Sequence, residues 1–505
     1  MEAGRSGSPA GSAPVAASSQ GAGTVASVAP VDASVPVPPT DDLDAGSGDA
    51  AVPTDAGAPV DAETSEPGPK PRPPTLVAGH VSGPISEGKP TLLDTVDLAA
   101  HGYVEHEYFV EGEASDYVAM GALNLDGKWV ARANGKAAYK TRIVVRRPSP
   151  TTQFNGTVLV EWLNVTTGKD AAVALRFAWE QLLRDGFAYV GVSVQQTGVD
   201  ALKNDDAARY GTLQHPGDAY GYDIFAQAAA AVAWPHALNV LEGLRPERFL
   251  AYGQSQSAMR MVTYINAIEP LHPFFDGAMI HSRARWGAPV GTESDGFLGN
   301  GMTVHVRDDV TARVMQFLTE SELFLPLGPA YDARQPDTDH LRTWEVAGAA
   351  HADRHLLGDN SDCGTINDGP QHFVVKAALH HMHLWMRDGV PPPVGAPIDV
   401  NAAENAIARD ANGNALGGIR TPAVDVPIAA LTGEWPPENA LNPLCMLYGQ
   451  TYPFSAAQLQ ALYPTHQDYV DKVIAAANAA ARAGFILPEE ESSIIDQARV
   501  AAIPD

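Results

Sequence analysis

The sequence predicts an α/β fold, in which a mainly parallel sheet is covered by helices on both faces. Short runs rich in Val, Ile and Thr alternate with segments of helical periodicity, and strands separated by helices usually pair in parallel. One serine also lies between a short apolar run and a helical pattern, which indicates a sharp turn from a strand into a helix. Both observations indicate that a functional site would lie at the edge of the sheet where the parallel strands end.

The first expected elements are a strand, a strand, a helix and a strand. Further strands and helical segments follow them along the chain. We expect strands at residues 140–146, 156–160, 187–194, 249–252, 275–280, 313–318 and 342–346, and helices at residues 171–183 and 226–241. The connections at residues 196–223 and 283–310 lack clean periodicity. Because they leave the carboxyl ends of strands, we expect them to form cap-like insertions.

Composition divides the chain into two parts. Residues 1–74 are rich in Ala, Ser, Pro and Gly and almost lack aromatic and long aliphatic side chains, so burial cannot offset their ordering entropy. We expect a disordered tail there and a single domain at residues 75–505. Within the C-terminal extension, Tyr469, Val473 and Ala477 share one face of a predicted helix that Gly484 can end.

The charge of the chain limits its partners. The 505 residues include 60 acidic and 33 basic side chains, and the net charge of −27 repels nucleic acids and anionic lipid surfaces. No run approaches the roughly 18 apolar residues of a membrane span. We therefore expect no nucleic-acid partner and no transmembrane segment. The oligomeric state stays open.

The two cysteines, Cys363 and Cys445, have no metal-ligand spacing. They can form one disulfide in an exported protein or remain two buried thiols in a cytosolic one, and the sequence does not decide between these states. The tail lacks the basic start and the leucine-rich stretch of a secretory signal. The compartment is unknown from the sequence, and we favour export to the periplasm or the medium slightly over the cytoplasm.

The strand-to-helix turn surrounds Ser255 in the stretch Gly-Gln-Ser-Gln-Ser. A cramped backbone at such a turn forces the serine outward and requires small residues two positions before and after it, as Gly253 and Ser257 are. Ser6 has the same spacing of small neighbours, but neither a strand nor a helix is predicted beside it. We therefore predict that Ser255 is a nucleophile.

A serine hydroxyl needs a base that takes its proton and an anion that orients and stabilises that base. In hydrolases of this architecture the acid follows the next-but-one strand and the histidine follows the last. His351 follows the last predicted strand and is the expected base. We favour Glu322, four residues before Pro326, as the acid, with Glu320 as the alternative and Asp353 as a weaker third candidate. Glu320 should instead bind loop amides or face solvent.

The oxyanion of acyl transfer needs two preorganised donors. We expect the backbone N–H of Gln256, directly after the serine, and that of Val165 or Asn164 in the loop after an earlier strand. This chemistry requires no cofactor and no metal. His380 and His383 share a helix face but have no carboxylate or cysteine at a ligand spacing, so we expect that face to be solvated.

Six stretches form a joint pattern: residues 158–165, 215–220, 252–258 with the elbow Gly-Gln-Ser-Gln-Ser-Ala, 344–351, 369–372 and 417–422. Together they resemble a family of bacterial α/β-hydrolase-domain proteins from about residue 79 to residue 485, which places the C-terminal extension in the same domain. The resemblance implies an α/β-hydrolase fold and a serine esterase with Ser255 as nucleophile and His351 as base. Members of the family more usually have aspartate in the place of Glu322.

These residues predict a serine hydrolase that cleaves a small-molecule carboxylic ester through a covalent acyl-enzyme intermediate. An acyltransferase, or an amide or peptide hydrolase, would use the same three side chains. The alternative of another class is a catalytically silent ligand-binding protein with the same fold. Neither the ester nor its acyl chain length follows from the sequence.

Overall fold

The computed structural model describes residues 73–503 except residues 92, 236–237, 292–300, 327, 359–362, 402 and 435–442. The predicted tail, residues 1–74, lies outside the described residues apart from its last two positions. It therefore stays a prediction, and so does the division of the chain at residue 75.

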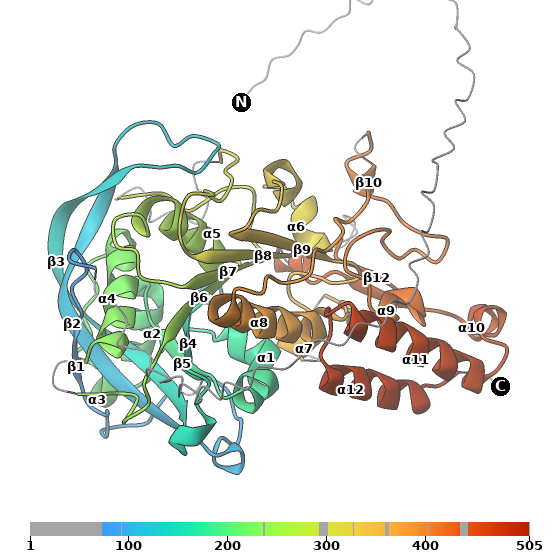
Figure 1. Ribbon diagram of the computed structural model, residues 1–505, viewed down its shortest axis with the longest axis horizontal. Helices are drawn as coiled ribbons and strands as arrows, with labels where there is room; N and C mark the ends of the chain where they lie inside the picture. The colour runs from blue at the N-terminus through green and yellow to red at the C-terminus, as the bar shows by residue number, and fades with distance from the viewer. Residues whose placement is uncertain are drawn as a thin grey trace, which may run out of the picture. The chain divides into compact units, whose positions relative to one another are not determined.

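A nine-stranded sheet organises the fold, in the order β1-β2-β3-β5-β4-β6-β7-β8-β9. Strands β5, β4, β6, β7, β8 and β9 pair in parallel, and β1, β2 and β3 extend the sheet antiparallel at one edge (Figure 1). This confirms the predicted, mainly parallel α/β sheet. The strands are β1 (His80–Ser82), β2 (Tyr103–Ala119), β3 (Ala131–Pro148), β4 (Thr157–Trp162), β5 (Ala188–Val192), β6 (Arg248–Gln254), β7 (Gly277–His281), β8 (Arg313–Thr319) and β9 (Leu341–Val346).

Helices cover both faces of this sheet. Strand β6 contributes side chains to the core on each face. Phe249 and Ala251 pack with α4 (Gly221–Ala233) and α5 (Gln256–Thr263) on one face. Leu250 and Tyr252 pack with helices α1 and α8 on the other. Successive residues of a strand point to opposite faces of the sheet. A strand that is buried on both faces therefore has a continuous run of apolar residues, as β6 has. The other helices are α1 (Val173–Arg184), α2 (Gln196–Asp205), α3 (Ala207–Tyr210), α6 (Glu320–Leu323), α7 (Arg354–Leu357), α8 (Gln371–Asp388), α9 (Pro422–Asp425), α10 (Ala456–Leu462), α11 (His466–Arg482) and α12 (Pro488–Arg499).

The clearest differences from the expected elements are one helix, α4, and one strand, β2. The helix predicted at residues 226–241 is α4, which starts earlier and ends at Ala233, because Pro235 cannot continue a helix and disfavours it in the preceding residue. The long strand β2 was not predicted, since acidic residues interrupt its apolar positions. One of them, Glu107, is buried because Arg142 and Arg209 neutralise it.

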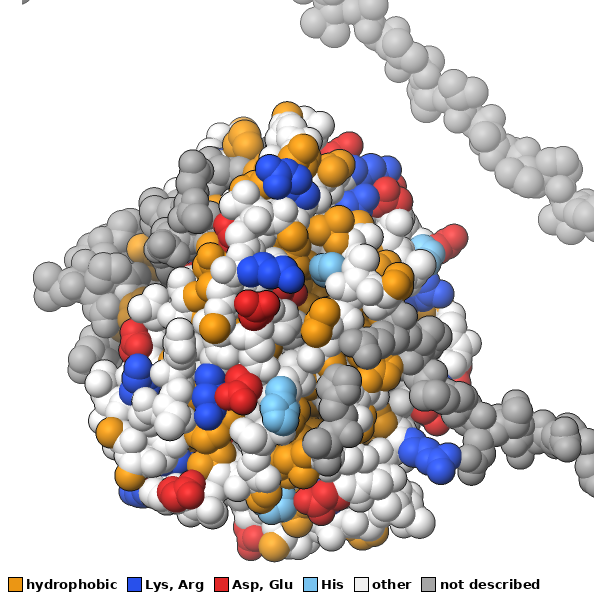
Figure 2. All heavy atoms as spheres, turned by 90° about the vertical axis from the view of Figure 1, so that its left-hand side faces the viewer, with side chains coloured by type: hydrophobic (Ala, Val, Ile, Leu, Met, Phe, Trp, Pro, Cys, Tyr) orange, Lys and Arg blue, Asp and Glu red, His pale blue; other side chains and the backbone are white. Residues whose placement is uncertain are grey.

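The outer face of the antiparallel edge carries both signs of charge. Figure 2 shows acidic and basic side chains lying beside one another there instead of gathering by sign. Lys140 of β3, for example, lies 3.6 Å from the carboxylate of Glu111 on β2 and 4.6 Å from the ring centre of Phe109. Among the helices that the structure describes, none is long and apolar enough to cross a membrane.

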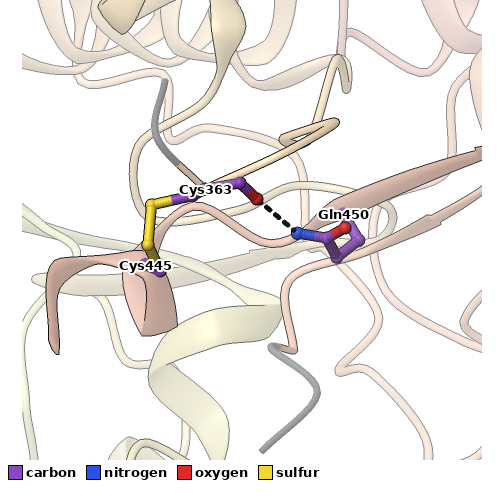
Figure 3. The surroundings of a disulfide bond; sticks show 3 residues. All are labelled: Cys363, Cys445 and Gln450. Atoms are coloured by element: carbon purple, nitrogen blue, oxygen red, sulfur yellow. Dashed lines mark hydrogen bonds between the residues drawn. A yellow bond between two sulfur atoms is a disulfide. The ribbon is translucent and has the colours of Figure 1, made fainter. Parts of the chain in front are cut away.

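The C-terminal extension packs beyond the β9 edge of the sheet (Figure 1). Helices α11 and α12 pack together, and the predicted face of α11 is buried. Cys363 and Cys445 form a disulfide with a Cα–Cα distance of 5.5 Å, and Gln450 donates to the Cys363 carbonyl (Figure 3). The disulfide attaches the 3-10 turn Pro443–Leu447 to the segment that follows β9. Two short hairpins complete this part: β10 (Val400–Asn401) with β11 (Ala406–Ile407), and β12 (Ala429–Thr432) with β13 (Gln450–Pro453).

Candidate active site

Ser255 lies at the turn between β6 and α5 with φ 60° and ψ −121°. A positive φ is strained for any residue but glycine, and such strain is concentrated at functional sites. The backbone N–H of Ser255 donates to the carbonyl of His281 at 2.9 Å, which holds the turn. Gly253 is needed because a Cβ there would lie 2.5 Å from the carbonyl oxygen of Ser257. The serine thus has the strand, turn and helix that the sequence predicts around it.

His351 lies in the loop after β9, between Ser255 and Glu322. Its Nε2 is 2.8 Å from Ser255 Oγ, and its Nδ1 is 2.6 Å from Glu322 Oε1. The histidine is 6% exposed and the glutamate 1%, so little water competes for these contacts. The backbone N–H of His351 donates to Ser321 Oγ at 3.0 Å, which fixes the loop against α6. The three side chains form a continuous hydrogen-bonded chain that ends at the serine.

The two candidate acids lie on one short helix instead of the expected loop. In a helix each residue turns by about 100°, so side chains two positions apart point in nearly opposite directions. Glu322 faces His351, and its second oxygen accepts from the N–H and Oγ1 of Thr319 at 2.6 and 2.8 Å. Glu320 faces the other way and cannot share that contact.

Glu320 belongs to the support of the loops. Its carboxylate accepts from the N–H of Gly348 at 2.6 Å, the N–H of Gly433 at 3.1 Å and Arg409 Nη2 at 2.9 Å. Burial raises the pKa of Glu320, while Arg409 opposes the rise. It binds loop amides, which is one of its two expected environments, and it is fully buried.

Asp353, the third candidate, caps α7. Its side chain accepts from the N–H of Leu356 at 3.1 Å, and it is fully buried. Burial raises the pKa of Asp353 to about 7. No hydrogen bond among the described residues joins Asp353 to His351, so it has the geometry of a helix cap.

The loop between β4 and α1 holds both expected alternatives for the second oxyanion donor. The backbone N–H of Asn164 donates to the carbonyl of Ala171 at 3.0 Å, so we favour Val165 over Asn164 as the second donor. The side-chain amide of Asn164 instead donates to the carbonyl of Gln254 at 2.9 Å and ties the loop to the residue before the serine. Among the described residues, no hydrogen bond uses the backbone N–H of Val165 or Gln256. These two remain the predicted donors.

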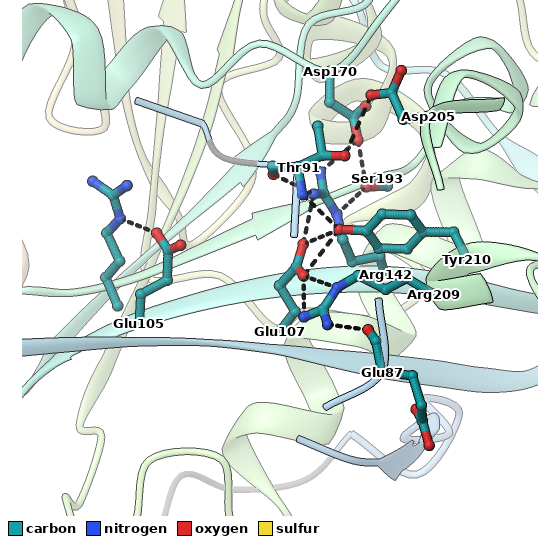
Figure 4. Close-up of polar contacts among 11 residues, drawn as sticks. Glu87, Thr91, Glu105, Glu107, Arg142, Asp170, Ser193, Asp205, Arg209 and Tyr210 are labelled. Atoms are coloured by element: carbon teal, nitrogen blue, oxygen red, sulfur yellow. Dashed lines mark hydrogen bonds and ion pairs between the residues drawn. The ribbon is translucent and has the colours of Figure 1, made fainter. Parts of the chain in front are cut away.

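A buried ion cluster, which the sequence analysis missed, holds the same loop from its other end. Asp170 accepts from Arg142 Nη2 at 2.8 Å and Ser193 Oγ at 2.5 Å, and Arg142 also pairs with Glu107 at 2.9 Å (Figure 4). An arginine inside the apolar run of β3 was the only sign of this cluster in the sequence. Its partners come from distant segments, which no local pattern connects.

A small cavity of about 100 Å³ opens over Ser255 and His351. Its walls come from the loop after β4, from α1, from the segment around α7 and from the 3-10 turn that the disulfide attaches. Neither expected insertion, at residues 196–223 or 283–310, contributes a described residue to these walls. The apolar walls include Val173, Leu356, Leu357, Leu444 and Leu447.

The face of α8 that carries His380 and His383 is not wholly solvated, contrary to our expectation. His383 is buried, and its Nδ1 lies 2.8 Å from Thr157 Oγ1 beneath the sheet, so a solvated environment is wrong for this residue. His380 lies 2.8 Å from the carboxylate of Asp185. Within the described ranges, no group of three or more His, Cys, Asp or Glu side chains is arranged to hold a metal ion.

Residues 73–496 match the alpha/beta hydrolase domain family, and the chain belongs to that family. Among solved structures, a putative dienelactone hydrolase from Klebsiella pneumoniae subsp. pneumoniae MGH 78578 is 12% identical, with a TM-score of 0.29 over 55% of this chain and 99% of its own. An esterase from Rhizomucor miehei is also 12% identical, with a TM-score of 0.28 over 54% of this chain and 83% of its own. No curated protein matches the chain.

Proposed function

We propose that this α/β-hydrolase-domain protein is a serine hydrolase that cleaves carboxylic esters through an acyl-enzyme intermediate. The observation that supports the proposal is the hydrogen-bonded chain from Glu322 through His351 to Ser255, with contacts of 2.6 and 2.8 Å. A strained serine at the start of a helix, a buried base and a buried anion are the parts that nucleophilic acyl transfer requires.

In this mechanism His351 Nε2 takes the proton of Ser255 while Oγ attacks the ester carbonyl. Glu322 holds Nδ1–H and stabilises the imidazolium that forms. The N–H groups of Gln256 and Val165 hold the oxyanion. The imidazolium then protonates the leaving alcohol, and water, activated by His351, hydrolyses the acyl-enzyme and restores the serine.

Labelling with a fluorophosphonate probe tests the nucleophile. Ser255→Ala should abolish labelling and lower kcat for ester hydrolysis by about a millionfold. The midpoint of thermal unfolding should hardly change, since the hydroxyl packs against little. Ser6→Ala, at the other serine with the same spacing, is the control and should label normally. Labelling that survives in Ser255→Ala would place the nucleophile elsewhere.

Analysis of the products separates the related reactions. Release of a free acid identifies a hydrolase, transfer of the acyl group to an added alcohol identifies an acyltransferase, and cleavage of the matching amide identifies an amidase or peptidase. If the probe does not label the wild-type protein and no ester turns over, the protein is a ligand-binding member of the fold.

A further inference from the structure

Arg176 is the one lysine or arginine among the described residues that line the cavity over Ser255. It projects from α1, three residues after the apolar wall residue Val173. The other walls combine aliphatic side chains, such as Leu356 and Leu447, with polar ones such as Thr166. A single cation in such a cavity offers one specific polar contact to a bound molecule.

No ion pair or hydrogen bond within the described part of the chain uses the Arg176 guanidinium. Glu180, four residues later on the same helix, has the spacing of an ion-pair partner, but its carboxylate lies 3.2 Å from Lys376 Nζ. His355 Nε2 lies 3.0 Å from the backbone carbonyl of Arg176, which leaves the side chain unaffected. The chain has 60 acidic and 33 basic residues, and yet no described carboxylate pairs with this guanidinium.

The charge of Arg176 reaches the carboxyl end of β4. Burial raises the pKa of Glu161 to about 7, and the charge of Arg176 is among the influences that oppose this rise. Glu161 itself accepts from the hydroxyl of Tyr189 at 2.7 Å and the N–H of Ala174 at 2.9 Å. Arg176 and the candidate nucleophile Ser255 both line the cavity at this end of the sheet.

From these contacts we infer that the substrate is an ester that carries a carboxylate group, which Arg176 binds while the aliphatic walls hold the adjoining carbon chain. The inference rests on the proposed ester hydrolysis and names its substrate class. A guanidinium presents parallel N–H donors that match the two oxygens of a carboxylate. Because Arg176 reaches solvent, screening limits the gain, and we expect a preference of about tenfold.

Matched pairs of esters test this substrate class on each side of the scissile bond. The acyl-side pair is the p-nitrophenyl monoester of adipic acid and p-nitrophenyl hexanoate, which have equal carbon counts. The alcohol-side pair is p-carboxyphenyl butyrate and phenyl butyrate. In at least one pair, kcat/KM should be about tenfold higher for the anionic member. Arg176→Gln should remove that preference.

Arg184→Gln is the matched control, because it removes the same charge about two turns along the same helix. It should retain the preference of the wild-type protein. A preference that is absent from both pairs, or that survives in Arg176→Gln, would overturn the inference even if both esters are hydrolysed.

Equilibrium binding separates this inference from the proposed function. Calorimetry should detect adipate binding to Ser255→Ala, and the added substitution Arg176→Gln should weaken it about tenfold. Binding without any ester turnover in the wild-type protein would overturn the proposed function and keep the anion site. Turnover with adipate affinity that does not depend on Arg176 would overturn the anion site alone.

Discussion

The candidate active site and the ion cluster around Arg142 are both buried and polar, but their charges are arranged differently. In the ion cluster two arginines, Arg142 and Arg209, face two carboxylates, Glu107 and Asp170, so positive and negative charges balance. At the active site the single carboxylate of Glu322 faces a histidine, and no arginine or lysine hydrogen-bonds it within the described residues.

This is the difference that we expect between a structural cluster and the proposed catalytic one. Burial alone would lower the pKa of Arg142, but Asp170 and Glu107 raise it above its ordinary value, so the guanidinium stays charged. A cluster of paired, opposite charges holds segments together, and this role requires no proton transfer. A carboxylate beside an imidazole leaves room for a positive charge to form during a reaction, which is what acyl transfer by serine requires.

Substitution of the candidate catalytic acid, Glu322, should have the largest effect in this comparison. Glu322→Gln keeps the shape of the side chain but favours the wrong tautomer of His351, so kcat should fall by about 10⁴-fold with little change in KM. Glu320→Gln should retain kcat and lose stability instead, because Glu320 binds Arg409 and two loop amides. Steady-state kinetics and urea unfolding of both variants measure this. Reversed results would mean that Glu320 serves the histidine.

The ion cluster should show the opposite behaviour. Arg142→Met leaves the carboxylate of Asp170 buried without its cation and should lower the free energy of unfolding by about 3–5 kcal/mol. The control Arg387→Met removes an exposed pair with Asp388 and should cost less than about 1 kcal/mol. Urea unfolding gives both values. An unchanged midpoint in Arg142→Met would show that the cluster does not stabilise the fold.

The smallest expected effect concerns the pH dependence of stability. It comes from Glu161, which belongs neither to the candidate active site nor to the ion cluster. The pKa of Glu161 is raised by burial to about 7, above its ordinary 4.5. Between these values the folded protein keeps a proton that the unfolded chain has lost, so stability falls as pH rises through this window, by on the order of 3 kcal/mol. Glu161→Gln should flatten this part of the stability profile, measured by urea unfolding from pH 4 to 8. An equally steep profile in the variant would assign the fall to other groups, such as Asp353.

Local patterns in the sequence predicted the parallel strands and the turn at Ser255. These features depend on neighbours along the chain: apolar runs for strands covered on both faces, and small residues where the backbone is cramped. The order of serine, acid and histidine followed from strand order, because the carboxyl ends of parallel strands meet at one edge of the sheet.

The tertiary structure decided what depends on direction and on distant partners. Glu320 and Glu322 differ by two positions, and only the helical turn of α6 separates the one that faces Arg409 from the one that faces His351. The pairing of Cys363 with Cys445 and the neutralisation of Arg142 each join segments that no local pattern relates. A buried polar group must find its partner in space, and the distance along the chain does not reveal where that partner lies.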